Sequence, residues 1–363
     1  MNSVDVVVPS YNYAHYLPGC VASLFDQDGV NVRVLIIDDA SSDNTPAVAA
    51  QLLSRYPGLQ YCRHIENVGH IATYNEGLLG WATAPYVLLI SADDLLAPGA
   101  LKRAVDQMER HQGVGMVCGM ALLFESGEDI ARAPTARADA LHAGLDTQIF
   151  PTEQLLLQCV RGNPIATPTV VVRTELQRAV GPYAPELPHS GDMEMWMRFA
   201  VNGKVAVTRF VQAYKRLHNN NMSKDYRALR DLRERFKAIE YALARDPATY
   251  TGYGLSRERV CQTMADEAYW EASRSLAAGD RAAALECLQF ALGLWPPIAR
   301  SAGWRKIQLE LHLSPWLYRS LRSIAAHLKR MLNRQRPATS AQPAPQPGTL
   351  QGWWPELPPR TRS

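Results

Sequence analysis

The sequence has no long hydrophobic segment. Its longest nearly unbroken apolar run, Val114–Phe124, falls far short of the ~20 residues that a membrane-spanning helix needs, so we do not expect an integral membrane protein. The opening residues, MNSVDVVVPSYN, carry no basic side chain and place Asp5 inside their apolar stretch. They do not resemble a signal peptide, and the sequence therefore favours a cytoplasmic protein.

Closely spaced cysteine pairs are also missing. The 363-residue chain has 6 cysteines, which lie far apart and form no CxxC pair. This spacing gives no support for a zinc ribbon or a dithiol redox site. It fits reduced, buried thiols in a cytoplasmic protein.

The chain as a whole lacks a large charge of one sign, since its net charge is +3. The charge is nevertheless unevenly distributed, with +8 on residues 301–363 and −5 on residues 1–300. An acidic body argues against a core that binds nucleic acid. The basic C-terminal region is suited to meet an anionic surface.

Residues 1–125 alternate between short apolar runs and stretches with helical spacing. The expected strands are Val4–Val8, Val32–Ile37, Leu59–Ile65, Tyr86–Ile90 and Val114–Phe124. Continuous apolar strands separated by helices predict an α/β fold with a mainly parallel central sheet. Ligands bind such sheets at the carboxyl ends of the strands.

Polar, turn-forming residues follow each of the first four strands. These segments are Pro9–Asn12, Asp38–Ser41, Glu66–Gly69 and Ser91–Asp94. Adjacent acids at the end of a buried strand repel each other, and a hard cation such as Mg²⁺ or Mn²⁺ would compensate their charge. Helix capping is the alternative for both acidic pairs, because a helix-start pattern follows each of them.

Five motifs in this chain occur in the order typical of a known family. They are VVVPSYN, LIIDDASSDNT, NVGHIATYNEGL, VLLISADD and HSGDMEMWMR. The series resembles that of family 2 glycosyltransferases with a GT-A fold, and the resemblance covers about residues 3–223. It implies a metal-dependent, inverting enzyme that uses a nucleotide-sugar donor.

The resemblance implies roles for individual residues around the donor. Asp39 matches the acid that accepts a hydrogen bond from the base. Asp93 and Asp94 match the DXD-type motif, with Asp94 on the metal and Asp93 on the ribose or the metal. His218 matches a histidine that contacts the metal or the diphosphate. The other positions that match the nucleotide-sugar site are Pro9, Ser10, Tyr11, Asn12, Asn67 and Gly69.

The same resemblance implies that Asp192 is the catalytic base. The family has Glu-Asp at this motif, whereas this chain has Gly191 before Asp192, so the supporting acid is not identified. Glu194 matches a secondary acid position of the family. His189 is a candidate for contact with the acceptor, with a solvated loop histidine as an equal alternative.

The expected reaction is sugar transfer from a UDP-sugar to an acceptor hydroxyl in polysaccharide, lipid-linked oligosaccharide or glycan synthesis. The pKa of such a hydroxyl is too high for unaided attack, so Asp192 would remove its proton. No motif supplies a second carboxylate on the opposite face of the sugar, which favours a single inverting displacement. Two alternatives are a sugar nucleotidyltransferase, which the absence of Lys or Arg from the first loop disfavours, and a non-catalytic GT-A-like scaffold.

Composition divides the remainder of the chain. We expect a GT-A domain over residues 1–223 with a loop at 126–150, an α-helical region over 224–335 and a disordered, Pro-rich tail over 336–363. Gly279-Asp280 lies between two Ala-rich stretches, as in a helical hairpin. Residues 315–336 combine an apolar stripe with basic flanks, which is typical of a helix on an anionic membrane or of a helix packed on its neighbours.

Overall fold

The computed structural model describes residues 1–125, 147–219, 221, 226, 228–313 and 349–352. The chain divides into two compact units, one of Met1–Asn221 with Pro345–Ser363 and the other of Met222–Ala344. The first unit contains the sheet, and the described part of the second is helical.

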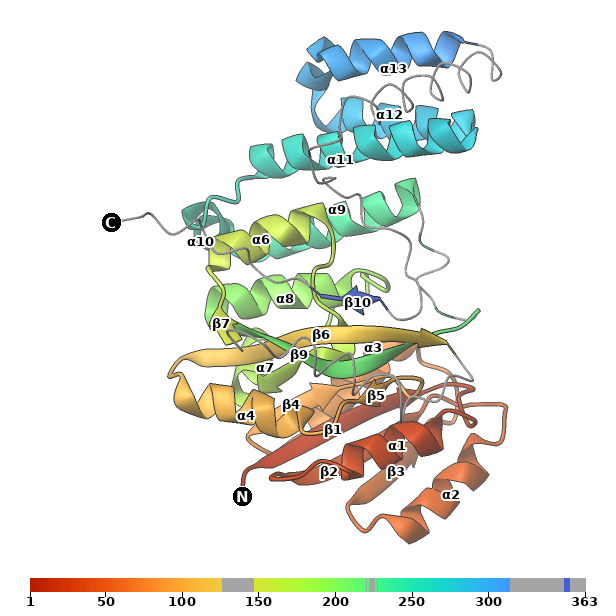
Figure 1. Ribbon diagram of the computed structural model, residues 1–363, viewed down its shortest axis with the longest axis vertical. Helices are drawn as coiled ribbons and strands as arrows, with labels where there is room; N and C mark the ends of the chain where they lie inside the picture. The colour runs from red at the N-terminus through yellow and green to blue at the C-terminus, as the bar shows by residue number, and fades with distance from the viewer. Residues whose placement is uncertain (126–146, 220, 222–225, 227, 314–348, 353–363) are drawn as a thin grey trace, which may run out of the picture. The chain divides into compact units, whose positions relative to one another are not determined.

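A ten-stranded mixed sheet forms the centre of the first unit (Figure 1). Four parallel strands come first, in the spatial order β3 (Leu59–Arg63), β2 (Asn31–Asp38), β1 (Ser3–Ser10) and β4 (Tyr86–Leu89). The order continues through β8 (Val171–Arg173), β6 (Val114–Glu125), β9 (Lys204–Leu217) and β5 (Leu95–Leu96). The long strands β6 and β9 are parallel to each other, whereas β8 is antiparallel to both β4 and β6.

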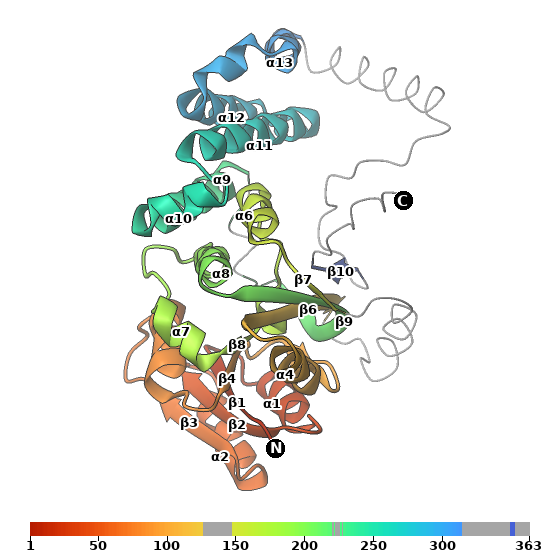
Figure 2. The ribbon, with the colours of Figure 1, turned by 90° about the vertical axis from the view of Figure 1, so that its left-hand side faces the viewer.

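Helices cover both faces of the sheet, and Figure 2 shows α1 and α4 on one side of β1 and β4 with α7 on the other. The first face carries α1 (Leu17–Phe25), α2 (Thr45–Arg55) and α4 (Ala100–Arg110). The second face carries α3 (His70–Asn75), the π-helix η1 (Glu76–Trp81), α7 (Thr174–Val180) and α8 (Gly191–Asn202). Proline at the start of α1 and of α2 favours the first helical turn because its φ is already helical.

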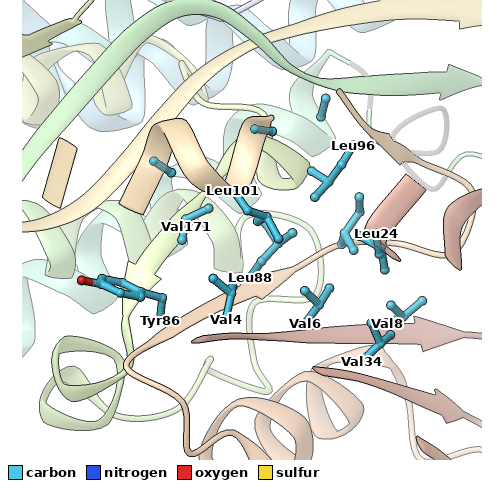
Figure 3. Close-up of a cluster of buried hydrophobic side chains, with 14 of the residues drawn as sticks. Val4, Val6, Val8, Leu24, Val34, Tyr86, Leu88, Leu96, Leu101 and Val171 are labelled. Carbon is cyan, nitrogen blue, oxygen red and sulfur yellow. The ribbon is translucent and has the colours of Figure 1, made fainter. Parts of the chain in front are cut away.

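The core on the first face consists of every second residue of the strands. Val4, Val6 and Val8 of β1 point to one side, as the two-residue period of a strand requires (Figure 3). Leu24 of α1 and Leu101 of α4 pack on the same cluster and are fully buried. Burial of each such side chain contributes about 1.5–3 kcal/mol, so this cluster stabilises the packing of the helices on the strands.

The sequence-based expectations for strands and helices in residues 1–125 are confirmed. Further along the chain lie α6 (Thr152–Arg161) and α8. β9 extends to Leu217 because it pairs along most of β6. The short strand β7 (Thr147–Ile149) pairs antiparallel with β9.

The tail contains a strand where disorder was expected. β10 (Leu350–Gln351) pairs antiparallel with Leu122 and Ala121 of β6. A hydrogen bond of 2.9 Å from Leu123 N to Thr349 O extends this pairing. Backbone bonds to a sheet do not depend on an apolar pattern, so the composition of the tail does not predict them.

The second unit contains α9 (Leu229–Arg245), α10 (Pro247–Gly252), α11 (Arg257–Ala278), α12 (Arg281–Leu294), the 3₁₀ turn η4 (Pro296–Arg300) and α13 (Ala302–His312). The expected hairpin at Gly279-Asp280 joins α11 to α12. Gly279 has a φ of 89°, which glycine adopts without strain, and Asp280 caps α12 by accepting a 2.9 Å bond from Ala283 N. Within the described residues, no helix is long and apolar enough to cross a membrane. Residues 126–146 and 315–336 lie outside the described residues.

Candidate active site

The loops after β1 and β2 are bonded to each other at the carboxyl edge of the sheet. Asp39 N donates to Ser10 O at 2.9 Å, and Asn12 N donates to Ser41 Oγ at 2.9 Å. Asn12 has a φ of 59° and Ala40 has a φ of 60°, both in the left-handed region that side chains other than glycine rarely adopt. Backbone strain of this kind is concentrated at functional sites, where the surrounding bonds maintain it.

Asp39 is buried and fixes the loop that follows β3. Its Oδ1 accepts a 2.9 Å bond from Val68 N, and its Oδ2 accepts a 2.9 Å bond from Gly69 N. His64 Nδ1 lies 2.7 Å from Asp39 Oδ1. Burial raises the pKa of Asp39, but these three bonds outweigh burial, so the pKa lies below its ordinary value and the carboxylate is ionised. Asn67 Oδ1 also accepts from Gly69 N, at 3.1 Å.

Asp93 and Asp94 lie in the turn between β4 and β5, and both are buried. Asp94 Oδ1 accepts a 2.9 Å bond from Arg216 N, and Arg216 Nε donates to Asp93 O at 2.9 Å. His218 Nε2 lies 2.7 Å from Asp93 Oδ2. The end of β9 therefore binds the acidic pair through both its backbone and its side chains. Burial and the neighbouring charge of Asp93 raise the pKa of Asp94 well above its ordinary value.

Aromatic rings hold the end of β9 in place. The Arg216 guanidinium lies 4.5 Å from the ring centroid of Tyr16 and 4.4 Å from that of Phe124. The His218 ring packs edge-on against Tyr13, with 5.5 Å between ring centroids. Cation–π contacts of this type contribute about 0.5–2 kcal/mol each. They fix the two side chains that contact Asp93.

The acidic pair has the chemistry of a divalent cation site. Asp93 Oδ1 is buried and has no hydrogen-bond partner, which leaves a carboxylate oxygen uncompensated away from water. Carboxylate oxygens are the ligands that Mg²⁺ and Mn²⁺ prefer. Among the described residues, however, no group of three His, Cys, Asp or Glu side chains is arranged to hold a metal. The expected set of Asp93, Asp94 and His218 is thus not a preformed three-ligand site.

Asp192 lies in the first turn of α8. Its Oδ2 accepts bonds from Asn163 Nδ2 at 2.9 Å and from Thr167 Oγ1 at 3.0 Å, and its Oδ1 accepts from Met193 N at 2.7 Å. Loss of solvation raises the pKa of Asp192 above its ordinary value, and the Thr167 bond lowers it in part. A raised pKa suits a carboxylate that accepts a proton during reaction near neutral pH.

The segment before α8 is bonded to α3. His70 Nε2 lies 2.8 Å from Pro188 O, while Asn75 Nδ2 donates to Tyr183 O at 2.9 Å and Asn75 Oδ1 accepts from Tyr183 N at 2.7 Å. The His70 and Asn75 side chains therefore bind backbone. This anchoring fixes the approach of the chain to Asp192.

Glu194 is fully buried within α8 and forms an ion pair with Arg198, with 2.7 Å between Oε2 and Nη2. Arg198 also donates to Val180 O at 2.7 Å and to Pro182 O at 2.8 Å. This arrangement gives Glu194 a structural role in holding the segment that leads into α8. At Gly191, an added Cβ would lie no closer than 3.7 Å to Ile71, Leu187 or Tyr183, so the backbone does not require glycine there.

Electrostatic coupling indicates that the acids share one region. The pKa of the Tyr74 hydroxyl is raised, first by burial and then by the charges of Asp192, Asp93 and Asp94. The positive charge of Lys215, on β9, lowers the pKa of both Asp94 and Asp192. Lys215 therefore lies within electrostatic reach of both. His189 also lowers the pKa of Asp192, which places it near that carboxylate.

Most of the residues that the sequence predicts for the site lie at this edge of the sheet. Tyr11 is half-exposed next to Ser10, whose Oγ is buried and has no hydrogen-bond partner. Sequence reasoning missed the residues that hold the acids in place, namely His64, Asn163, Thr167, Lys215 and Arg216. Asn163 and Thr167 precede Asp192 by 29 and 25 residues, so no local spacing connects them to it.

Comparison with known proteins finds a family model that matches the first part of the chain. Residues 5–163 match the model of glycosyl transferase family 2, which confirms the resemblance seen in the motifs over that segment. The chain is similar over 92% of its length to a crystal structure of S. aureus TarS 1–349 in complex with UDP-GlcNAc, with a TM-score of 0.58 and 18% identity. A second crystal structure of TarS 1–349 gives a TM-score of 0.57 at 15% identity. The expected GT-A fold with a helical C-terminal region is thereby confirmed.

Curated relatives share part of their length with this chain. An uncharacterized glycosyltransferase of Nostoc sp. (strain PCC 7120) is 27% identical over 228 residues, which are 61% of this chain and 67% of the relative. An uncharacterized protein of Mycobacterium tuberculosis is 27% identical over 56% of this chain and 63% of the relative. The succinoglycan biosynthesis protein ExoO of Rhizobium meliloti is 28% identical over 36% of this chain and 39% of its own length. The chain thus matches about two thirds of the first two relatives and a smaller part of ExoO.

Proposed function

We propose that this protein transfers a sugar from a UDP-sugar to an acceptor hydroxyl with inversion at the anomeric carbon. The observation that carries the proposal is geometric: Asp192 is held by Asn163 and Thr167, and Asp93 keeps a buried Oδ1 without a hydrogen-bond partner. The charges of Asp192, Asp93 and Asp94 all raise the pKa of Tyr74, which supports their lying in one region. A proton acceptor near a site for a charged leaving group is what one displacement step requires.

Asp39 would bind the base of the donor. An ionised carboxylate accepts hydrogen bonds only, and its two oxygens offer about four acceptor positions, so capacity remains beside Val68 N, Gly69 N and His64 for an N–H of uracil. Tyr11 follows Ser10, whose backbone oxygen accepts from Asp39 N, and Val68 N donates to the Asp39 carboxylate. The Tyr11 and Val68 residues are each 48% exposed. Exposed apolar side chains beside a fixed acceptor are suited to contact the faces of a base.

Asp93 and Asp94 would hold Mg²⁺ or Mn²⁺, with His218 on the metal or on the diphosphate. The buried, unpartnered Asp93 Oδ1 supports this assignment. These residues would hold the cation where, when bound, it would supply positive charge for a nucleoside diphosphate leaving group. Lys215, whose charge lowers the pKa of both Asp94 and Asp192, would add a second positive charge.

Asp192 would remove the proton of the acceptor hydroxyl. Its partners Asn163 and Thr167 both donate to Oδ2, while the Oδ1 bond from Met193 N comes from the start of its own helix. The carboxylate is therefore oriented before an acceptor arrives, and no reorganisation is needed during proton transfer.

The acceptor class that we propose is a carbohydrate of a polysaccharide, a lipid-linked oligosaccharide or a glycan. The partial match to the succinoglycan biosynthesis protein ExoO supports this class. Peripheral contact of residues 315–336 with an anionic membrane would suit a lipid-linked acceptor, and these residues lie outside the described part of the chain.

A donor screen tests the proposed activity. The full-length protein is heated with Mn²⁺ and each of a panel of UDP-sugars, because a ligand that binds the folded state raises the melting temperature. Donors that stabilise the fold are then incubated with candidate glycan acceptors, and release of UDP is measured. A protein that releases pyrophosphate from UTP and a sugar phosphate would instead be a nucleotidyltransferase. One that neither binds nor turns over any nucleotide-sugar would be a scaffold.

A further inference from the structure

His64 lies between two carboxylates at the edge of the proposed donor site. Its Nδ1 is 2.7 Å from Asp39 Oδ1, and its Nε2 is 2.8 Å from Glu76 Oε2. The His64 side chain is 12% exposed, that of Asp39 is 6% exposed and that of Glu76 is 46% exposed. The three side chains come from the loop after β3, the loop after β2 and the first residue of the π-helix η1.

The two nitrogen–carboxylate contacts determine the protonation state of His64. An ionised carboxylate has no proton to donate, so each nitrogen of His64 must carry a proton to satisfy both contacts. Only the imidazolium form has two N–H donors, whereas the neutral ring would place a lone pair against one of the carboxylates. Charge-assisted hydrogen bonds of this kind are about twice as strong as neutral ones.

We infer that His64 is a positioning residue for the donor site: as an imidazolium held by Glu76, it fixes the Asp39 carboxylate and with it the 67–69 loop, and so makes nucleotide binding depend on pH. This inference rests on the proposed function, because it assigns Asp39 to the nucleotide base. His64 itself acts through Asp39 and is not assigned a contact with the donor.

The surroundings of His64 determine the direction of the pH effect. Burial lowers the pKa of His64, but the bonds to Asp39 and Glu76 raise it further, so it lies above the ordinary value. Other ionisable groups face this cluster from β2 and β3. Asp38 accepts a 2.9 Å bond from His64 N through its backbone oxygen, and its side chain pairs with Arg63 at 3.6 Å and with the Tyr61 hydroxyl. Cys62 Sγ lies 3.8 Å from Glu76 Oε1.

The imidazolium is present below its raised pKa and loses one proton as the pH rises through it. One of the two carboxylates is then left facing a lone pair, and the fixed geometry of Asp39 relaxes. Nucleotide affinity should therefore be constant in mildly acidic solution and fall as the pH rises through the pKa of His64. The pKa of Asp39 is lowered, so Asp39 does not titrate in that range.

The test measures binding of UDP to the full-length protein between pH 5.5 and 9 at a fixed Mg²⁺ concentration. The variant His64→Asn keeps an amide donor toward Asp39 but has no charge and no bond to Glu76. The terminal phosphate of UDP titrates near pH 6, and comparing wild type with variant at each pH cancels that effect. His111→Asn is the matched control, because His111 is exposed at the end of α4, away from both acids.

We expect His64→Asn to weaken UDP binding about tenfold in mildly acidic solution, which corresponds to about 1.4 kcal/mol, and to lose the decline toward high pH. In Glu76→Gln the affinity for UDP should still fall as the pH rises, but at a lower pH than in wild type. The reason is that one of the bonds that raises the pKa of His64 is weakened. A purely structural role for His64 would not predict this shift. The control should reproduce the wild-type profile.

Two outcomes would overturn the inference alone, with the proposed function intact. One is UDP binding by His64→Asn with the wild-type affinity and profile. The other is an unshifted profile in Glu76→Gln, which remains informative even if His64→Asn does not fold. Failure of the wild-type protein to bind UDP at any pH, with the melting curve showing a folded chain, would overturn the proposed function and this inference together.

Discussion

The hydrogen bond from Thr167 to Asp192 allows a direct test of the proposed base. Thr167 Oγ1 lies 3.0 Å from Asp192 Oδ2, and the bond lowers the pKa of a carboxylate that loss of solvation raises. Thr167→Val removes the hydroxyl and keeps the shape of the side chain. The change should raise the pKa of Asp192 further, because the charged form loses a donor while burial is unchanged.

The size of the effect follows from the type of bond. A hydrogen bond to a charged group contributes about 1.5–3 kcal/mol, and 1.36 kcal/mol corresponds to one pKa unit. Asn163 still donates to Oδ2, and the site is partly open to solvent, so we expect the lower limit, a shift of about one unit. A base acts when it is deprotonated, so kcat falls as the pH falls through its pKa. The acidic limb of the kcat profile should move up by about one pH unit.

The assay is sugar transfer at saturating donor and acceptor between pH 4.5 and 8.5. Thr169→Val is the matched control, because Thr169 belongs to the same 3₁₀ turn but its hydroxyl donates to Ala166 O at 2.7 Å. It should lower stability without moving the limb. An acidic limb in Thr167→Val that coincides with that of wild type would refute the assignment of the limb to Asp192.

Four further predictions concern the metal, the packing of the first unit and the C-terminal region. Asp94→Asn, or excess chelator, should abolish transfer while leaving the melting temperature nearly unchanged, and full activity in chelator would disprove metal dependence. Arg198→Met should lower the free energy of unfolding by about 3–5 kcal/mol in chemical denaturation, because it removes one member of a fully buried ion pair with Glu194; a loss below about 1 kcal/mol would contradict the structural role of this pair. Gly77→Ala should cost about 1–3 kcal/mol in the same measurement, since its Cβ would lie 2.3 Å from Val7 Cγ1, and a neutral substitution would show that η1 packs differently. Full-length protein should sediment with anionic vesicles and not with neutral ones, whereas a chain ending at Ser314 should sediment with neither; equal, negligible binding to both vesicle types by the full-length protein would remove the membrane proposal.

The mainly parallel sheet and the position of the acids at the ends of its strands could be predicted from the sequence. The alternation of apolar strands with helices is a local pattern, and it predicted that the segments after β1, β2 and β4 would reach one edge. Asp39 and the Asp93–Asp94 pair lie there because each directly follows a buried strand. The GT-A fold itself was predicted from the order of the motifs and not from any single one.

The contacts that set the properties of the acids could not be predicted in this way. Asp192 is bonded to Asn163 and Thr167, which approach it only after α6 and the following turn have folded. His64 reads in the sequence as a polar residue at the end of a strand, and its role depends on Glu76 from a helix of unusual π geometry. The pairing of β10 with β6 joins segments more than 200 residues apart, beyond any local pattern.

The central claim is that Asp192 is the base of a sugar transfer whose donor is bound elsewhere in the site. The most direct test compares wild type with Asp192→Asn for UDP affinity and for transfer from the donor that the screen identifies. The account predicts an unchanged dissociation constant for UDP and a turnover that is lower by about 10²–10⁴-fold. Wild-type turnover in Asp192→Asn, or loss of UDP affinity with turnover retained, would contradict it.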